Sequence, residues 1–312
     1  MPDWKILLCD GLQNNGQAIL RAAADVDDRD GISGDDLLKV AGNYDAYIVR
    51  GRTKVTAAVI KAAPSLKVIG RVGVGVDNID IQAASEYGVT VVNTPTATSL
   101  AVAELTIGLL FALARSIPHA DSSMKDGAWI KKQLCGVELK GKTLGIIGIG
   151  NIGSIVAGRA ASLKMDVIGN DILTDDETKR NKAYLVPLNE LYARSDFISL
   201  HIPLTAETRS MIDAFALSQM KPGVRLVCTA RGGIIDEDAL LTSLESGQVA
   251  AAALDVFAKE PPGSTALITH PSVIATPHIG AQTAEAQTRA AAHIADEVLA
   301  ALRGESLRWK VV

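Results

Sequence analysis

The feature that most constrains this chain is a glycine-rich turn between two apolar runs. Residues 144–153 read LGIIGIGNIG, so the first run leads directly into glycines spaced as GxGxxG. The second run, residues 165–169, ends shortly before Asp171, which lies 18 positions after Gly153. This order of strand, turn, helix, strand and acid is typical of a dinucleotide-binding unit. A glycine turn alone would also suit an ordinary α/β domain.

Each position of the turn has a physical role. Gly148 permits a tight turn after the strand, Gly150 lets the backbone approach a pyrophosphate, and Gly153 lets the helix pack against the sheet. The start of the helix, at Asn151 and Ile152, offers amide N–H groups and a partial positive charge to phosphates. We therefore predict that the cofactor is bound by Gly148, Gly150, Asn151, Ile152 and Gly153.

The acid after the second strand selects the cofactor. The Asp171 carboxylate can accept hydrogen bonds from both hydroxyls of an adenosine ribose, and it would repel a 2′-phosphate. Residues 172–174 offer no cation, and Lys179 and Arg180 lie further along the chain. We therefore predict NAD rather than NADP.

Length, composition and charge narrow the class of protein. The chain has 312 residues, of which 48% are hydrophobic, and a net charge of −4 with both signs interspersed. These values predict one large or two moderate domains and no nucleic-acid partner. The 3 cysteines and 5 histidines show no metal-binding spacing, so no metal site is predicted.

A membrane-bound or secreted protein is not expected from this sequence. The longest apolar segment, residues 100–114, contains Glu104 and is shorter than the ~20 residues that a membrane span needs. The N-terminus lacks the pattern of a secretion signal. We expect no membrane partner and a cytoplasmic location.

Short apolar segments alternate with helical patterns along the whole chain. The expected strands are residues 5–9, 44–49, 66–69, 89–92, 144–147, 165–169, 197–202, 225–229, 251–256 and 273–275. The expected helices are residues 18–24, 56–63, 81–87, 99–117, 152–163, 208–220, 236–246 and 281–302. Such alternation predicts an α/β fold with parallel sheets covered on both faces.

The glycine turn begins too late to share one sheet comfortably with the first strands. We therefore expect two doubly wound domains, with a Rossmann NAD-binding domain inserted into a flavodoxin-like substrate-binding domain. The expected bounds are 96–283 for the NAD-binding domain, and 1–95 with 284–312 for the substrate-binding domain. Ligands in such sheets bind at the carboxyl ends of the strands.

Three polar residues follow expected strands in the second half of the chain. Arg231 lies in TARGGIID, Glu260 in DVFAKEP and His278 in TPHIG. Hydride transfer from an alcohol carbon needs a base for the hydroxyl proton and a cation for an acid group of the substrate. Each residue alone would suit a solvated loop. Together, in a domain assigned to a dinucleotide, they predict a catalytic trio.

The glycine turn and the Arg-Gly-Gly, Glu-Pro and Pro-His segments, in this order, closely resemble the D-isomer-specific 2-hydroxyacid dehydrogenases. The resemblance covers nearly the whole chain. Four further segments are similar to the members that act on D-3-phosphoglycerate: GVGVDNID at 73–80, AELT at 103–106, SMKDGAW at 123–129 and GVELKGKT at 136–143.

The resemblance implies a role for each polar residue. His278 would take the hydroxyl proton as hydride leaves for the nicotinamide, and Glu260 would hydrogen-bond the other imidazole nitrogen and fix its tautomer. Arg231 would hold the substrate carboxylate and polarise the 2-oxo group. Asp255 would bind the nicotinamide carboxamide, and Thr229 also falls among the cofactor-binding positions.

The first domain would supply the remaining substrate contacts. In the family, backbone N–H groups of the loop that contains Val74 and Gly75 bind the substrate carboxylate. The arginines proposed for a distal phosphate are Arg50, Arg52, Arg71 and Arg115. Arg52 matches only some of the phosphoglycerate enzymes. Taken without the resemblance, the loop could be a plain glycine turn and the arginines ordinary surface residues.

Two departures from the family pattern leave the distal group of the substrate open. Residues 93–99 read NTPTATS where Asn-Gly-Asn more usually follows the proline, and Gly51 stands where serine is common. A sulfonate or a second carboxylate would also suit an arginine-lined pocket.

The leading hypothesis is an NAD-dependent dehydrogenase of D-3-phosphoglycerate, or of a close anionic 2-hydroxy acid, with a place in serine biosynthesis. The alternatives are a reductase of glyoxylate, hydroxypyruvate or sulfopyruvate, and a non-catalytic NAD-sensing binding protein. The resemblance also implies a homodimer formed through the nucleotide domain, by the helix at 99–117 and the arm around Trp129. Because the sequence ends near residue 312, we expect no serine feedback through a C-terminal regulatory domain.

Overall fold

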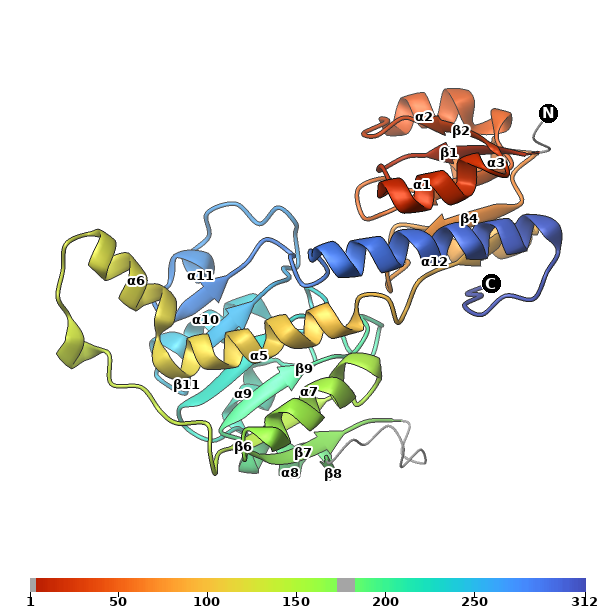
Figure 1. The fold of residues 1–312 in the computed structure, drawn as a ribbon. Coiled ribbons are helices and arrows are strands. Elements are labelled where there is room, and N and C mark those ends of the chain that lie inside the picture. The colour runs from red at the N-terminus through yellow and green to blue at the C-terminus, as the bar shows by residue number, and fades with distance from the viewer. Residues whose placement is uncertain (1–3, 173–182) are drawn as a thin grey trace. The chain divides into compact units, whose positions relative to one another are not determined.

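The computed structural model describes residues 4–172 and 183–312 and has the expected α/β fold with parallel sheets (Figure 1). The chain falls into two compact units. The first comprises Met1–Thr98 and Ala281–Val312, and the second comprises Ser99–Gly280. The chain therefore leaves the first unit once and returns to it with its last helix.

The first unit is built on a five-stranded parallel sheet in the order β2-β1-β3-β4-β5. Its strands are β1 (Lys5–Leu8), β2 (Asp25–Asp28), β3 (Ala46–Val49), β4 (Val68–Arg71) and β5 (Thr90–Val92). Strand β2, which reads DVDD, was not expected from the sequence. This strand pairs with β1 at the edge of the sheet, and Val26 is its one buried residue, so it has no apolar run to reveal it.

Helices cover both faces of this first sheet. They are α1 (Asn14–Arg21), α2 (Gly34–Val40), α3 (Ala57–Lys61), α4 (Ile81–Glu86) and α12 (Ala284–Arg303), with a 3₁₀ turn at Ala41–Asn43. The helices α1 and α12 pack on one face, where Leu20 and Ile294 enter a buried cluster. The helices α2, α3 and α4 pack on the other face through residues such as Leu37 and Ile60.

The second unit has a seven-stranded parallel sheet in the order β12-β11-β10-β9-β6-β7-β8. Its strands are β6 (Thr143–Ile147), β7 (Asp166–Asn170), β8 (Tyr184–Leu185), β9 (Phe197–Leu200), β10 (Val224–Cys228), β11 (Val249–Leu254) and β12 (Val273–Ala275). The strand order changes direction at β6, which lies between β7 and β9. Ligands of such sheets bind at the carboxyl ends of the strands at this switch point.

The helices of the second unit are α5 (Ser99–Arg115), α6 (Ile117–Lys125), α7 (Asn151–Ser162), α8 (Leu188–Arg194), α9 (Ala214–Ser218), α10 (Glu237–Glu245) and α11 (Ala266–Thr269), with a 3₁₀ turn at Lys131–Gln133. The long apolar helix α5 packs with α7 over one face of the sheet, as Figure 1 shows. The other face is covered through buried residues of α8, α9, α10 and α11.

The helix expected over residues 208–220 is much shorter in the structure. Ser210 has a left-handed φ of 49°, and Ile212 forms a parallel bridge with Ile235. The backbone is therefore not helical at these residues, and α9 begins only after Asp213, which caps it by accepting the Ala216 N–H. A capping acid marks where a helix begins more reliably than the apolar residues before it.

No single helix among the described residues is long and apolar enough to cross a membrane. The helices α5 and α6 would meet the length and composition requirement only together, and the chain bends by 65° between them.

Candidate functional site

The glycine turn joins β6 to α7, and two of its glycines occupy positions that a side chain would disturb. Gly148 has a φ of +93°, which favours glycine, and a Cβ on Gly153 would collide with the carbonyl oxygen of Gly148. Gly150 is the N-cap residue of α7, and no side chain caps the helix there. A Cβ on Gly150 would meet no atom within 4 Å. The first amides of α7, at Asn151 and Ile152, therefore begin the helix beside open space, which suits an anionic group.

The acid that follows β7 lies against this turn. Asp171 Oδ2 accepts the Ile149 N–H at 2.6 Å. A hollow at the same edge of the sheet is lined by Asn170, Asp171, Leu185, Val186 and Pro187. The arrangement fits the adenosine end of a dinucleotide. Leu173, Thr174, Lys179 and Arg180, which were part of the argument against NADP, lie outside the described residues.

A histidine that the sequence analysis did not single out lies just after β9, next to the same turn. The His201 N–H donates to Ile147 at 2.8 Å, and its Nε2 lies 2.7 Å from Ser199 Oγ. Its Nδ1 is buried and has no partner among the described residues. Burial disfavours the imidazolium and lowers the pKa of His201 to about 3. The ring is therefore neutral at physiological pH.

A buried carboxylate organises the loop that carries His278. Asp255 follows β11 and is 1% exposed. It accepts the Thr276 hydroxyl at 2.6 Å and the N–H groups of Ile279 and Gly280 at 2.8 Å each. His278 lies inside this loop with a left-handed φ of 53°, a conformation that disfavours residues with a Cβ. The contacts of Asp255 therefore hold His278 in a conformation that it would not prefer alone.

The imidazole of His278 is oriented by a second carboxylate. His278 Nδ1 lies 2.8 Å from Glu260 Oε2, and Glu260 Oε1 accepts the Phe257 N–H at 3.1 Å. The side chains of His278 and Glu260 are 50% and 38% exposed. A hydrogen bond at Nδ1 leaves Nε2 of a half-exposed ring to exchange a proton with a bound molecule.

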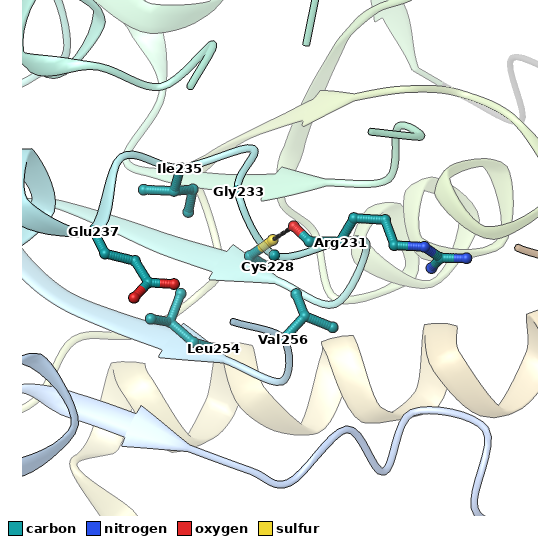
Figure 2. Close-up of a pocket in the computed structure, with 8 residues that line it drawn as sticks. Cys228, Arg231, Gly233, Ile235, Glu237, Leu254 and Val256 are labelled. Carbon is teal, nitrogen blue, oxygen red and sulfur yellow. Dashed lines mark hydrogen bonds between the residues drawn. The ribbon is translucent and has the colours of Figure 1, made fainter. Parts of the chain in front are cut away.

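The loop that carries Arg231 lines a small cavity together with the end of β11 (Figure 2), and it packs on the loop that carries Glu260. A Cβ on Gly232 would collide with the Phe257 carbonyl group. Glu237, at the start of α10, accepts the Ala258 N–H at 2.7 Å. In Figure 2 the Arg231 guanidinium points away from Glu237, and its Nη1 donates to Ala230 at 2.7 Å. Glu237 was not predicted from the sequence, because an acid in the first turn of a helix usually only stabilises the helix through its interaction with the helix dipole.

Thr229 and Asp255 lie at the ends of neighbouring strands, β10 and β11. Thr229 is buried, and its hydroxyl oxygen lies 3.0 Å from that of Thr106 on α5. Both expected cofactor residues therefore already make contacts within their own unit. Their contacts with a nicotinamide remain predictions.

The expected substrate residues fall in both units. Arg50 and Arg52 share the loop after β3, and Arg71 ends the neighbouring strand β4, where it pairs in register with Val49. Val74 is 39% exposed, and its carbonyl oxygen accepts a hydrogen bond from the Asn93 side chain at 2.7 Å. Gly75 follows it in the same loop.

Arg115 is the last residue of α5, so it belongs to the other unit. Within the described ranges 4–172 and 183–312, no group of three or more His, Cys, Asp and Glu side chains could hold a metal ion.

Comparison with known proteins identifies the family. The family model described as "D-isomer specific 2-hydroxyacid dehydrogenase, NAD binding domain" matches residues 107–280. D-3-phosphoglycerate dehydrogenase of Methanocaldococcus jannaschii is 47% identical over 303 residues, which cover 96% of this chain and 58% of that protein. The chain spans about half the length of the curated relatives it matches.

Two solved structures have the same fold over nearly their full length. A glyoxylate reductase from Paecilomyes thermophila superposes with a TM-score of 0.92 at 33% identity, covering 100% of this chain and 99% of that one. An acyclic imino acid reductase in complex with NADPH and D-Arg has a TM-score of 0.90 at 28% identity, covering 99% and 100%. The matched domain binds NAD, and NAD(H) is the cofactor that the comparisons indicate.

Proposed function

Because the chain belongs to the D-isomer-specific 2-hydroxyacid dehydrogenases, we propose that it is an NAD-dependent dehydrogenase of D-3-phosphoglycerate or of a close anionic 2-hydroxy acid. The observation that carries this proposal is the hydrogen bond between His278 and Glu260, in the same unit as the dinucleotide turn. A binding protein would need the turn but not this pair.

The proposed reaction assigns one task to each side chain. NAD, when bound, supplies the acceptor for hydride. His278 Nε2 takes the proton of the substrate hydroxyl, while Glu260 keeps the ring oriented through Nδ1. Arg231 binds the carboxylate and polarises the 2-oxo group as it forms. In the reverse direction His278 returns the proton.

The substrate assignment rests on cations in the first unit and on the curated relatives. Arg50 follows β3, and Arg71 is the last residue of the neighbouring strand β4, so two positive charges lie near the carboxyl ends of these strands. The relative from M. jannaschii is named D-3-phosphoglycerate dehydrogenase. The N–H groups of Val74 and Gly75 would hold the substrate carboxylate.

A substrate panel tests this assignment. The expected result is that kcat/KM for 3-phosphoglycerate exceeds that for D-glycerate by at least about tenfold, because losing a hydrogen bond to a charged group costs about 1.5–3 kcal/mol. Equal values for the two acids would contradict a phosphate-binding role for the arginines. The panel would also include D-lactate and sulfolactate.

A second candidate is a reductase of a smaller 2-oxo acid. It is favoured by the close structural similarity to a glyoxylate reductase. NADH oxidation with glyoxylate, hydroxypyruvate and sulfopyruvate would distinguish it from the first candidate. An NAD-sensing binding protein would leave NADH unchanged with every acid tested.

We also propose a homodimer formed through the second unit. Exposed apolar side chains occur in three successive parts of this unit, namely α5, α6 and the segment after α6. They are Phe111, Ile117, Met124 and Trp129. Trp129 is 77% exposed, which is unusual for so large an apolar group. Sedimentation at micromolar concentration should give twice the monomer mass of 32.7 kDa. The cytoplasmic location remains a prediction from the sequence.

A further inference from the structure

A second buried acid organises the arginine-bearing loop of the first unit. Strand β1 lies between β2 and β3, so the order of this sheet changes direction at β1. The carboxyl ends of β1 and β3 therefore border the switch point, where sheets of this kind bind ligands. Asp10 follows β1, and residues 50–53, which contain Arg50 and Arg52, follow β3. We call residues 50–53 the arginine loop.

The arginine loop is held from two sides. Asp10 is 8% exposed, and its carboxylate accepts the Arg50 N–H at 2.7 Å, the Thr53 hydroxyl at 2.6 Å and the Thr53 N–H at 3.2 Å. On the other side, the Asn78 amide donates to the carbonyl oxygens of Thr53 at 2.6 Å and Arg50 at 3.2 Å. Both ends of the loop are thus fixed through their backbone.

The two guanidinium groups of this loop have different partners. Arg52 forms ion pairs with Asp10, at 3.4 Å, and with Asp30, so two carboxylates oppose its charge. The Arg50 guanidinium donates to Gln287, an uncharged side chain that is 9% exposed. Gln287 is in turn held by the carbonyl oxygen of Ala281 at 2.8 Å. A carboxylate partner weakens the attraction of a cation for a second anion, and an amide does not.

We propose that Asp10 is a positioning residue that fixes the arginine loop and engages Arg52, so that Arg50 supplies the charge for the distal anionic group of the substrate. This inference rests on the proposed function for its substrate class. Asp10 itself touches the loop and not the substrate. Its carboxylate accepts the Arg50 N–H and the N–H and hydroxyl groups of Thr53. These hydrogen bonds hold the loop in one conformation before any ligand binds.

The first test compares the two arginines. Arg50→Gln should lower kcat/KM for 3-phosphoglycerate by at least about tenfold, as expected for losing a charged hydrogen-bond partner. Arg52→Gln should have a clearly smaller effect on the same quantity. An equal or larger effect of Arg52→Gln would overturn the division of roles between the two arginines.

The second test separates positioning from general stability. Asp10→Asn should lower the ratio of kcat/KM for 3-phosphoglycerate to that for D-glycerate, and it should speed amide hydrogen exchange in residues 50–53. Asp30→Asn is the matched control, because both acids pair with Arg52 but, of the two, only Asp10 accepts N–H groups of the loop backbone. The control should retain slow exchange and most of the ratio. An Asp10→Asn protein with wild-type ratio and wild-type exchange would refute the proposal.

Thr53→Val covers the case in which Asp10→Asn does not fold. It removes one hydroxyl donor to Asp10 and should change the ratio and the exchange in the same direction, by a smaller factor. No change in either quantity would count against Asp10. If the wild-type protein itself does not distinguish the two acids, the proposed substrate class fails, and the exchange measurement still decides whether Asp10 holds the loop.

Discussion

Two loops of this molecule, one in each unit, are organised by a buried aspartate that follows a parallel strand. Asp255 accepts donors of the loop around His278, and Asp10 accepts donors of the loop around Arg50. They differ in one respect: Asp10 also pairs with a cation, Arg52, whereas the contacts of Asp255 are with a hydroxyl and backbone N–H groups. An acid at a strand end can therefore orient a loop that carries a candidate functional residue.

Expectations from the sequence differed for the two aspartates. Asp255 was expected to bind the nicotinamide, yet its carboxylate already accepts three hydrogen bonds from its own loop. A carboxylate can accept more than three hydrogen bonds, so the contact of Asp255 with the cofactor stays a prediction. Asp10 was given no role, because a single acid after a strand resembles an ordinary cap.

The largest expected effect is on kcat and comes from replacing His278 in the second unit. His278→Ala should lower kcat by about 10²–10⁴-fold, the usual contribution of a general acid or base. NADH affinity, measured by fluorescence titration, should stay near the wild-type value, because the dinucleotide turn is untouched. His119→Ala, at an exposed position on α6, is the control. A His278→Ala enzyme with wild-type kcat would refute the proposed proton transfer.

The two aspartates can be compared directly through stability. Asp255→Ala leaves two backbone N–H groups and a hydroxyl without their acceptor, so the free energy of unfolding should fall by about 3 kcal/mol. Asp10→Ala should lower the free energy of unfolding by a similar amount, because it also removes the acceptor of two backbone N–H groups and a hydroxyl. Urea unfolding measures both. If one substitution costs less than a third of the other, the two loops are not held by equivalent means.

Asp171 is a third strand-end acid, and its carboxylate is expected to serve the ligand. Asp171→Ala should raise the Kd for NAD by about tenfold or more and should reduce the preference for NAD over NADP. Isothermal titration with both cofactors measures these changes. Asp166→Ala, at the exposed start of β7, is the control. An unchanged preference would argue that the cofactor's ribose does not meet Asp171.

A further difference between the units is their sensitivity to acid. The pKa of His201 is lowered to about 3 in the folded protein, so below pH 6.5 the unfolded chain binds a proton that the folded chain does not. Stability should therefore fall as the pH drops, by about 2 kcal/mol at pH 5. Hydrogen exchange should show this loss in β9 and less in β3.

His201→Gln should flatten that pH dependence, because glutamine does not titrate and can still bond Ser199. The exposed His119→Gln is the control. Identical pH dependences for the wild-type and His201→Gln proteins would show that the buried ring does not govern acid sensitivity.

Much of the fold could be predicted from the sequence, because buried parallel strands are continuous apolar runs. The segments around Ile146, Ile198 and Leu226 were recognised in this way, and each is fully buried. The edge strand β2 was missed because its neighbours do not require it to be apolar. The expected helix at 208–220 was wrong in its first half, where the bridge from Ile212 to Ile235 overrides local helical preference.

Some residues of the candidate site could likewise be predicted from the sequence, and others could not. Gly148, Gly153 and Asp171 could be predicted because their spacing reflects local geometry within one strand–turn–helix unit. Glu260 and His278 were found as polar residues that follow expected strands, but their pairing and their roles needed the family resemblance, because they belong to different loops. Asp10 and Glu237 could not be found at all, because their partners lie 40–43 and 21 residues away and carry no motif.

The sequence by itself determined the α/β class, the dinucleotide turn and the family, because these depend on periodicity and on short-range spacing that any folded form must keep. Only the tertiary structure decided which acid holds which loop, that Arg52 is engaged by carboxylates while Arg50 meets an amide, and that His201 is neutral. Those properties depend on distance and burial, and both arise only when strands remote in the chain become neighbours in a sheet.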